Sequence, residues 1–199
     1  MGKEFETNIT KEVDFRNEAN NAEKIAKLLS DDKRVVIPKI FWEYTKDSVI
    51  VMSFEEGKSI TNMSNIKKNN IKLKEIANIL TDTFNRQIFE FGFVHSDPHP
   101  GNLFVRKENV NGKDMTKLVL LDHGLYRDLD DSFRYNYCLL WRGLITQNKD
   151  MLRESCNALG VSQVELFISV LTSNTYDSIM SKENKYNSHK QLGLKSNSS

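Results

Sequence analysis

The sequence predicts an α+β protein, in which a first part with a helix and strands precedes a mostly helical second part. Stretches rich in β-branched and other apolar residues at 35–44, 48–54, 102–105 and 117–121 indicate strands. After residue 132, by contrast, apolar residues recur every three or four positions, as they do on helices. The length of 199 residues, with 39% hydrophobic and 28% charged residues, suits a globular protein with a buried core.

Helices are expected at both ends of this arrangement. An amphipathic helix is predicted over 11–30, and a longer one over 71–91 that Gly92 would end. After Asp122 only helices are expected. Of the three that follow, the second would be capped by Asn148 or Asp150 and the third by Ser162. The expected domains are a first part at 1–57, a second at 58–181 and a disordered polar tail at 182–199.

The segment HSDPHPGN at 95–102 carries the most informative spacing in the chain. Asp97 comes two residues after His95 and Asn102 five after Asp97, which is the H-x-D-x-x-x-x-N spacing of a kinase catalytic loop. Asp122 opens a D-x-G triplet twenty residues after Asn102, and a hairpin between them would bring both to one end. In kinases the loop Asp accepts the substrate proton, while the Asn and the D-x-G Asp hold magnesium on ATP. The spacing therefore predicts Asp97, Asn102 and Asp122 as catalytic residues, with Asn102 and Asp122 as Mg²⁺ ligands.

The same segment allows other interpretations. His95, Asp97 and His99 alternate, and they could form the divalent-metal cluster of a hydrolase. Because that interpretation leaves the D-x-G triplet unexplained, a kinase-like site is favoured. In such a site we expect His95 and His99 to brace the loop through hydrogen bonds. A small-molecule kinase of the aminoglycoside or choline type shares the loop spacing and is a further alternative.

Four segments resemble the UbiB/aarF-domain atypical kinases, over about residues 12–180. DPHPGN matches the catalytic loop of that family, and KEVDFRNEANN at 11–21 looks like its E-x-D-(F/Y)-x-x-E-A-x-N signature. VIPKIFWEYTKDSVIVMSFEEGKSI at 36–60 looks like the strand pair that leads into its interlobe hinge. LLDHGLYRDLDDSFRYNYCLLWRGLI at 120–145 resembles the mitochondrial ADCK-type branch. The resemblance implies a protein-kinase-like fold, with helix αC and strands in a partial N-lobe and a mostly helical C-lobe.

The resemblance also implies roles for residues outside the loop. Glu18 matches the αC glutamate that pairs with the ATP-binding lysine, and Glu12 and Asp14 match the E-x-D pair near the nucleotide. Phe54 and Glu55 fall in the hinge, where backbone groups would bind adenine. The implied cofactors are Mg²⁺ and ATP, and the implied partners are a nucleotide and a lipid or membrane-associated small molecule. The implied function is ATPase or phosphotransfer chemistry linked to mitochondrial lipid or quinone homeostasis.

The first residues of the chain lack two motifs of the family. MGKEFETNIT contains neither a V-A-x-K strand nor an alanine-rich phosphate loop, and neither Lys3 nor Lys11 lies in a strand pattern. We therefore expect a fragment, a shortened gene product or a degenerate protein, and a 199-residue chain that is catalytically incompetent. The alternative function is that of a non-catalytic pseudokinase that acts as a binding or regulatory protein.

Composition argues against several other classes of protein. The net charge of +1 gives no basic footprint for nucleic acid, and no apolar run reaches the roughly 18 residues of a membrane span. No signal peptide is visible, and MGKEFETN lacks the arginines of a transit peptide, so a cytoplasmic location is the alternative to a mitochondrial one. Cys138 and Cys156 have neither CxxC nor zinc-ligand spacing, and reduced thiols are expected.

Overall fold

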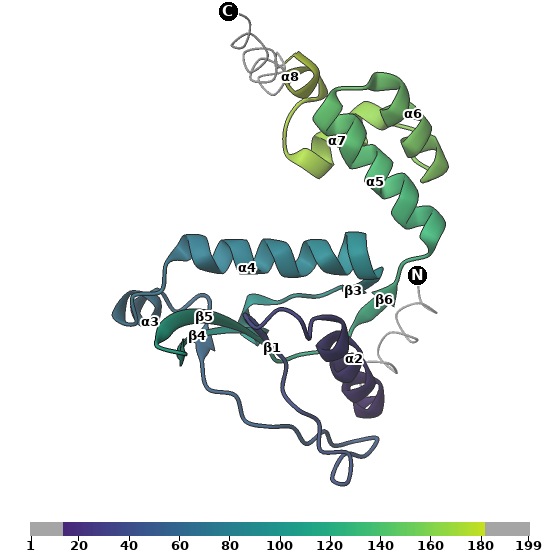
Figure 1. Ribbon diagram of the computed structural model, residues 1–199. Helices are drawn as coiled ribbons and strands as arrows, with labels where there is room; N and C mark the ends of the chain where they lie inside the picture. Colours follow the sequence, from purple (N-terminus) through teal and green to yellow (C-terminus); the bar gives the residue numbers. More distant parts are fainter. Residues whose placement is uncertain (1–13, 182–199) are drawn as a thin grey trace, which may run out of the picture. The chain divides into compact units, whose positions relative to one another are not determined.

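The structure is a computed structural model that describes residues 14–181. These residues form two compact units that divide between Leu129 and Asp130 (Figure 1). Glu12 and the predicted tail at 182–199 lie outside the described residues. The predicted domain boundary after residue 57 falls inside the first unit and stays a prediction.

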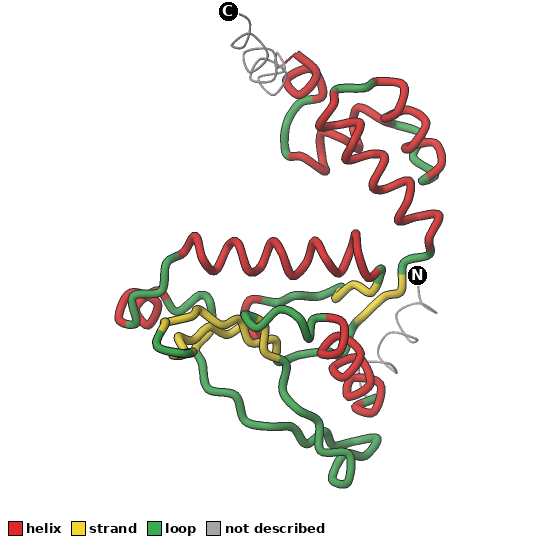
Figure 2. Tube along the Cα trace, viewed as in Figure 1, coloured by secondary structure: helices red, strands yellow, loops and turns green. Residues whose placement is uncertain are grey.

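A four-stranded sheet organises the first unit (Figure 2). Its strands lie in the order β1 (Val35–Val36), β5 (Lys113–Leu120), β4 (Leu103–Val110) and β2 (Lys58–Ser59). β1 is parallel to β5, whereas the other neighbours are antiparallel. Asn111 and Gly112 turn the β4–β5 hairpin with φ angles of 54° and 78°, the left-handed backbone that a tight two-residue turn requires. The predicted hairpin is confirmed, and its register pairs Leu103 with Leu120 at the open end.

Two helices pack on the hairpin. They are α3 (Met63–Lys68) and α4 (Leu73–Asn85), and α4 lies along the sheet (Figure 1). Side chains that alternate along β4 and β5 share one core with isoleucines of the helices and their connection. The buried members of this core are Ile66, Ile71, Ile76, Ile79, Leu103, Val105, Leu118 and Leu120. Burial of these side chains fixes the hairpin, and with it the position of the residues at its open end.

Helix α4 continues beyond Asn85 as a π-helical turn, η1 (Arg86–Phe91), and ends at Gly92. Gly92 has a left-handed φ of 63°, so the predicted helix over 71–91 and its glycine end are confirmed. β3 (Phe93–His95) follows and pairs antiparallel with β6 (Tyr126–Asp128). The expectation of helices alone after Asp122 is therefore wrong at β6, because the backbone groups of β3 find their hydrogen-bond partners there.

Helix α2 (Phe15–Leu28) confirms the predicted first helix within the described residues. The carboxylate of Asp14 caps it by accepting two backbone N–H groups of the first turn, both at 3.1 Å. The helix packs against Ile40 on one side and Phe93 on the other. Its buried side chains are Ala19, Ala22 and Ile25.

The segment at 37–57 is mostly irregular, so the strands predicted over 35–44 and 48–54 are wrong in extent. Beyond Val35–Val36, this part of the chain has only isolated bridges, from Ile40 to Met52 and from Lys46 to Val49. Pro38 has no N–H to donate to a strand ladder. The chain then turns at 41–45, where the Thr45 N–H donates to the Phe41 carbonyl at 3.1 Å.

The described part of the second unit is helical: α5 (Asp131–Thr146), α6 (Lys149–Ala158), α7 (Val164–Thr172) and α8 (Tyr176–Ser181). Helices α5 and α6 approach closely at Gly143, where a Cβ atom would lie 2.9 Å from the Leu152 side chain. The buried core of the unit consists of Leu140, Leu144, Leu152, Cys156 and Ile168.

The helix caps and cysteines of this unit test three predictions. Asn148 caps α6 by accepting the Met151 N–H at 3.0 Å, as predicted. Ser162 does not cap α7, which begins after Gln163 without a side-chain cap bond, so that prediction is wrong. Cys156 is buried, Cys138 is exposed and both thiols are free, as predicted.

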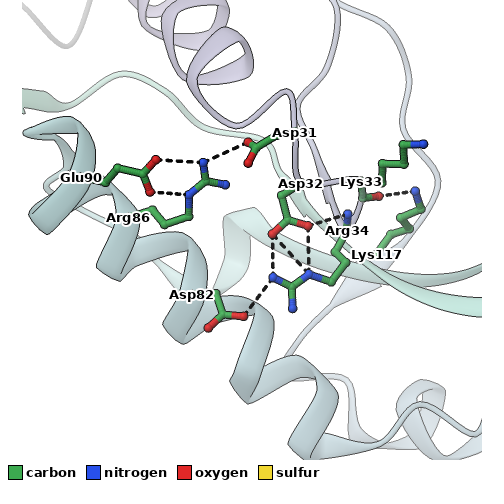
Figure 3. Close-up of polar contacts among 8 residues, drawn as sticks. All are labelled: Asp31, Asp32, Lys33, Arg34, Asp82, Arg86, Glu90 and Lys117. Atoms are coloured by element: carbon green, nitrogen blue, oxygen red, sulfur yellow. Dashed lines mark hydrogen bonds and ion pairs between the residues drawn. The ribbon is translucent and has the colours of Figure 1, made fainter.

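Ion pairs connect the turn after α2 to the α4–η1 helix of the same unit (Figure 3). Arg34 precedes β1, and Arg86 is the first residue of η1. Their partners are Asp32 at 2.7 Å and Asp82 at 2.9 Å for Arg34, and Glu90 at 2.8 Å and Asp31 at 3.0 Å for Arg86. Hydrogen bonds from Arg34 lower the pKa of the Asp32 carboxyl, which favours its ionised form and thus an ion pair with the Arg34 guanidinium. Alongside, Lys117 of β5 donates to the Lys33 carbonyl, so the turn is held to both the helix and the sheet.

Candidate functional site

The open end of the β4–β5 hairpin brings Asn102 and Asp122 together. The 3₁₀ turn η2 (Pro100–Asn102) leads into β4, and Asp122 follows β5. The Asn102 Nδ2 donates to the Asp122 Oδ2 at 2.7 Å, and the backbone N–H of Gly124 donates to the Asp122 Oδ1 at 2.9 Å. Strand pairing thus sets the distance between the two side chains, and the D-x-G turn sets the orientation of the carboxylate.

Glu18 of α2 reaches the same turn. Its Oε1 accepts the backbone N–H of His123 at 3.3 Å, and the side chain of Asn21 donates to the His123 carbonyl at 2.9 Å. Burial raises the pKa of the Glu18 carboxyl; the hydrogen bond from His123 opposes this rise, and the charge of Asp122 adds to it. Among the described residues no lysine or arginine forms an ion pair with Glu18. A cation beside Glu18 would offset both the desolvation of its carboxylate and the repulsion from Asp122.

The loop between β3 and η2 carries Asp97 on its exposed side. The Asp97 N–H donates to the Nδ1 of His95 at 3.3 Å, and its carbonyl accepts the N–H of His99 at 2.8 Å. The Nδ1 of His99 accepts the N–H of Gly101 at 3.1 Å and so caps η2. Both histidines brace the loop as predicted, and the Asp97 carboxylate stays accessible to solvent.

A buried layer of rings lies beneath this loop. His123 is 1% exposed, its Nδ1 lies 3.1 Å from the hydroxyl of Tyr126, and its Nε2 lies 3.1 Å from the Leu120 carbonyl. The ring of His95 stacks on Tyr126 with centroids 5.0 Å apart. Burial lowers the pKa of His123 to about 4 and also lowers the pKa of His95. Both imidazoles are therefore neutral near pH 7, and the histidine side chains that pack against the loop carry no charge.

Of the other predicted binding residues, some make contacts of a different kind and one lies outside residues 14–181. Asp14 caps α2, and Glu12 precedes the described residues. Phe54 is 90% exposed, whereas Glu55 accepts a hydrogen bond from Ser53 and pairs with Arg106 of β4 at 2.9 Å. A nucleotide-binding role of Glu12, Asp14, Phe54 and Glu55 stays a prediction.

The donor atoms at the hairpin end suit magnesium. Mg²⁺ prefers oxygen ligands and is held in proteins by one or two side chains, with water and phosphate oxygens completing the set. Asp122 offers carboxylate oxygens, and Asn102 keeps its Oδ1 free of the bond that its Nδ2 makes. Within residues 14–181 no group of three or more His, Cys, Asp and Glu side chains could hold a metal ion. The metal cluster considered for His95, Asp97 and His99 is therefore not formed, because the Nδ1 of each imidazole accepts a backbone N–H of the loop.

Two contributors to the site, Gln87 and Asn21, escaped the sequence analysis. Gln87 is fully buried in η1, and its Oε1 accepts the His95 N–H at 2.9 Å. One signal was available: Gln87 interrupts an apolar helix face, three residues after Phe84 and four before Phe91. Asn21 lies on α2 among other polar residues and gave no such signal.

Together, the sheet, the helix that carries Glu18, the braced loop and the D-x-G turn define a kinase-like domain of an atypical kind. Residues 1–156 match the model of the ABC1 atypical kinase-like domain. The chain belongs to this family, which confirms the resemblance inferred from its motifs.

Similar proteins agree with the assignment to this family. The chain is similar to AarF domain-containing kinase 1 of Drosophila melanogaster, with 36% identity over 201 residues, 99% of this chain and 38% of the relative. It is similar to AarF domain-containing protein kinase 1 of Mus musculus, with 41% identity over 177 residues, 88% of this chain and 33% of the relative. The chain therefore spans about a third of the length of these relatives.

A solved structure shares the fold. Rv3197 of Mycobacterium tuberculosis, determined in complex with erythromycin, superposes with a TM-score of 0.56 at 22% identity. The match covers 73% of this chain and 35% of Rv3197. The kinase-like α+β fold predicted from the sequence is thus confirmed. Between residues 14 and 181, no helix is both long and apolar enough to cross a membrane.

Proposed function

We propose that this chain provides the magnesium-binding and catalytic-loop side of an ATP-dependent phosphotransfer or ATPase site. One observation carries the proposal: the Asn102 amide and the Asp122 carboxylate meet at 2.7 Å at the end of a hairpin whose preceding loop exposes Asp97. A kinase needs these three groups on one side of the nucleotide phosphates.

Each residue has a distinct task in this proposal. Asp122 and Asn102 would hold Mg²⁺, which when bound neutralises charge on the phosphates. Asp97 would orient the attacking hydroxyl or water and accept its proton, since its carboxylate faces solvent while its backbone is held by His95. Glu18 would hold the ammonium of a lysine that positions the phosphates, which would offset the cost of its partial burial.

The wider activity is part of the same proposal. Membership of the ABC1 family and relatives named as kinases support the use of ATP and Mg²⁺. The motif resemblance supports a mitochondrial setting and a link to lipid or quinone homeostasis. These expectations concern the whole protein, because the chain spans about a third of its relatives.

The experiment is a calorimetric titration of the 199-residue chain with ADP, with and without Mg²⁺. Wild type should bind the nucleotide more tightly with Mg²⁺, and Asp122→Asn should abolish this difference, because the amide lacks the charge that holds the cation. Asp114→Asn is the matched control: it lies near the other end of β5 and is exposed. Magnesium-dependent binding that survives in Asp122→Asn would refute the assignment.

A second function, that of a non-catalytic binding or regulatory protein, has one observation in its favour. Glu18 forms no ion pair with a cation of the described residues, although phosphotransfer needs a positive group on the phosphates. The two functions differ in a single measurement. Nucleotide binding without hydrolysis, in a protein that also carries the V-A-x-K strand and the alanine-rich phosphate loop of the family, would favour the binding role.

A further inference from the structure

Gln87 occupies an unusual place for a polar side chain. It lies in the π turn η1 and is completely buried. Its Oε1 accepts the His95 N–H at 2.9 Å, but its Nε2 is buried without a hydrogen-bond partner among residues 14–181. An unpaired buried N–H is unfavourable compared with an apolar side chain of the same shape. The bond to His95 is what distinguishes Gln87 from a residue that only fills the core.

His95 transmits this constraint to the catalytic loop. The same residue whose N–H is held by Gln87 accepts the Asp97 N–H through its ring Nδ1, at 3.3 Å. His95 is 4% exposed, and its ring stacks on Tyr126 with an interplanar angle of 20°, so the ring has little room to rotate. Two consecutive hydrogen bonds thus run from the helix to the backbone of Asp97.

The π turn is also held on its other side. Arg86 directly precedes Gln87, and its guanidinium bonds Glu90 four residues later and Asp31 in the turn after α2 (Figure 3). The guanidinium lies 4.9 Å from the centroid of the Phe91 ring. A turn anchored in this way is a firm base for the side chain of Gln87. π turns in α-helices occur often at functional sites.

We propose that Gln87 is a positioning residue for Asp97: its carbonyl oxygen fixes the His95 backbone, and the His95 ring fixes the Asp97 backbone. The inference rests on the proposed function only where it gives Asp97 a role in phosphotransfer. The two hydrogen bonds belong to the chain itself and can be measured without nucleotide.

The test is amide hydrogen exchange, followed by NMR on the nucleotide-free 199-residue chain. Gln87→Met keeps the shape and removes the acceptor, Gln87→Glu keeps an acceptor oxygen, and Thr83→Val is the matched control. Thr83 lies four residues before Gln87, and its hydroxyl is likewise buried without a partner among the described residues. Gln87→Met should raise exchange at His95 and Asp97 by about tenfold or more. Gln87→Glu should restore most protection at His95, and Thr83→Val should change neither amide by more than about twofold.

Two outcomes of this experiment would overturn the inference. One is unchanged exchange at His95 and Asp97 in Gln87→Met. The other is an equal rise at Leu118 and Val119 in the core of β5, which would mean general destabilisation. The wild-type chain offers a measurement that needs no variant: the ring ¹⁵N shifts of His95 should show an unprotonated Nδ1 near pH 7. A protonated Nδ1 would overturn the relay, whereas a wild-type chain that binds no magnesium–nucleotide would refute the proposed function alone.

Discussion

The hairpin end with its neighbouring loop (93–128) and the irregular segment at 37–57 differ in what holds them in place. In the first region, paired strands and hydrogen bonds of 2.7 and 2.9 Å fix Asp122. In the second, isolated bridges replace strands, and Tyr44 and Phe54 are 60% and 90% exposed. Both regions are rich in β-branched and aromatic residues. The difference teaches that such composition makes a strand only where a partner strand lies in register beside it.

The largest expected effect in the first region is loss of stability in acid. The folded pKa of His123 is about 4, against an ordinary value of 6.5, so the unfolded state takes up a proton first as the pH falls. Stability should therefore drop between about pH 6.5 and pH 4, by at most about 3 kcal/mol from this residue. Urea unfolding across this range measures the loss, and His123→Gln should flatten the curve. An equally steep curve in the variant would contradict the assignment; the segment at 37–57 contains no histidine.

Matched valine substitutions compare packing in the two regions. Val105 of β4 is 1% exposed and Val49 is 49% exposed. Val105→Ala should lower the free energy of unfolding by about 2 kcal/mol, because it removes buried methyl groups and leaves a cavity. Val49→Ala should cost less than about 0.5 kcal/mol. Similar losses in the two variants, measured by urea unfolding, would mean that the segment at 37–57 is packed as tightly as the hairpin.

A smaller effect of opposite sign is expected at Glu18. Burial raises the pKa of its carboxyl, so ionised Glu18 lowers stability at neutral pH. Glu18→Gln should raise the free energy of unfolding near pH 7 by less than about 1 kcal/mol, since solvent screens part of the effect. The gain should shrink as the pH falls through the folded pKa and vanish below the ordinary value of 4.5, where both states are protonated. Glu43→Gln, an exposed glutamate at 37–57, is the control, and a stability loss in Glu18→Gln would contradict the argument.

The last comparison is expected to show no difference in the rate of ATP hydrolysis. The purified 199-residue chain should hydrolyse ATP no faster than its Asp122→Asn variant, because several groups must hold the phosphates together and no described cation pairs with Glu18. A coupled phosphate-release assay with Mg²⁺ measures the rate. Metal-dependent hydrolysis in the wild type alone would show that another group of this chain, such as Lys3 or Lys11, supplies the positive charge.

Much of the fold and part of the site could be predicted because the determining interactions are local. The loop spacing places Asp97 and Asn102, and a hairpin with a two-residue turn brings Asp122 back to Asn102. The motif resemblance assigned Glu18 to the site. Its contact with His123 could not be read from periodicity, because residues more than a hundred positions apart share no local pattern.

The features that escaped prediction depend on long-range partners. β6 forms because β3 lies beside it. Ser162 does not cap α7 because the helix begins one residue later than predicted. The proposed role of Gln87 depends on its burial and on its hydrogen bond to His95. None of these can be read from a helical or strand period alone.

The parallel pairing of β1 with β5 has a consequence for the order in which the site assembles. The β4–β5 hairpin closes a two-residue turn, an event on the scale of microseconds. Pairing Val35 with Leu118 closes a loop of 83 residues (118 − 35 = 83), which is entropically far more demanding. Asn102 and Asp122 should therefore meet early in folding, whereas Glu18 joins them only when the long loop closes. A newly folding chain would pass through a state that already presents the proposed metal ligands but still lacks the helix that carries Glu18.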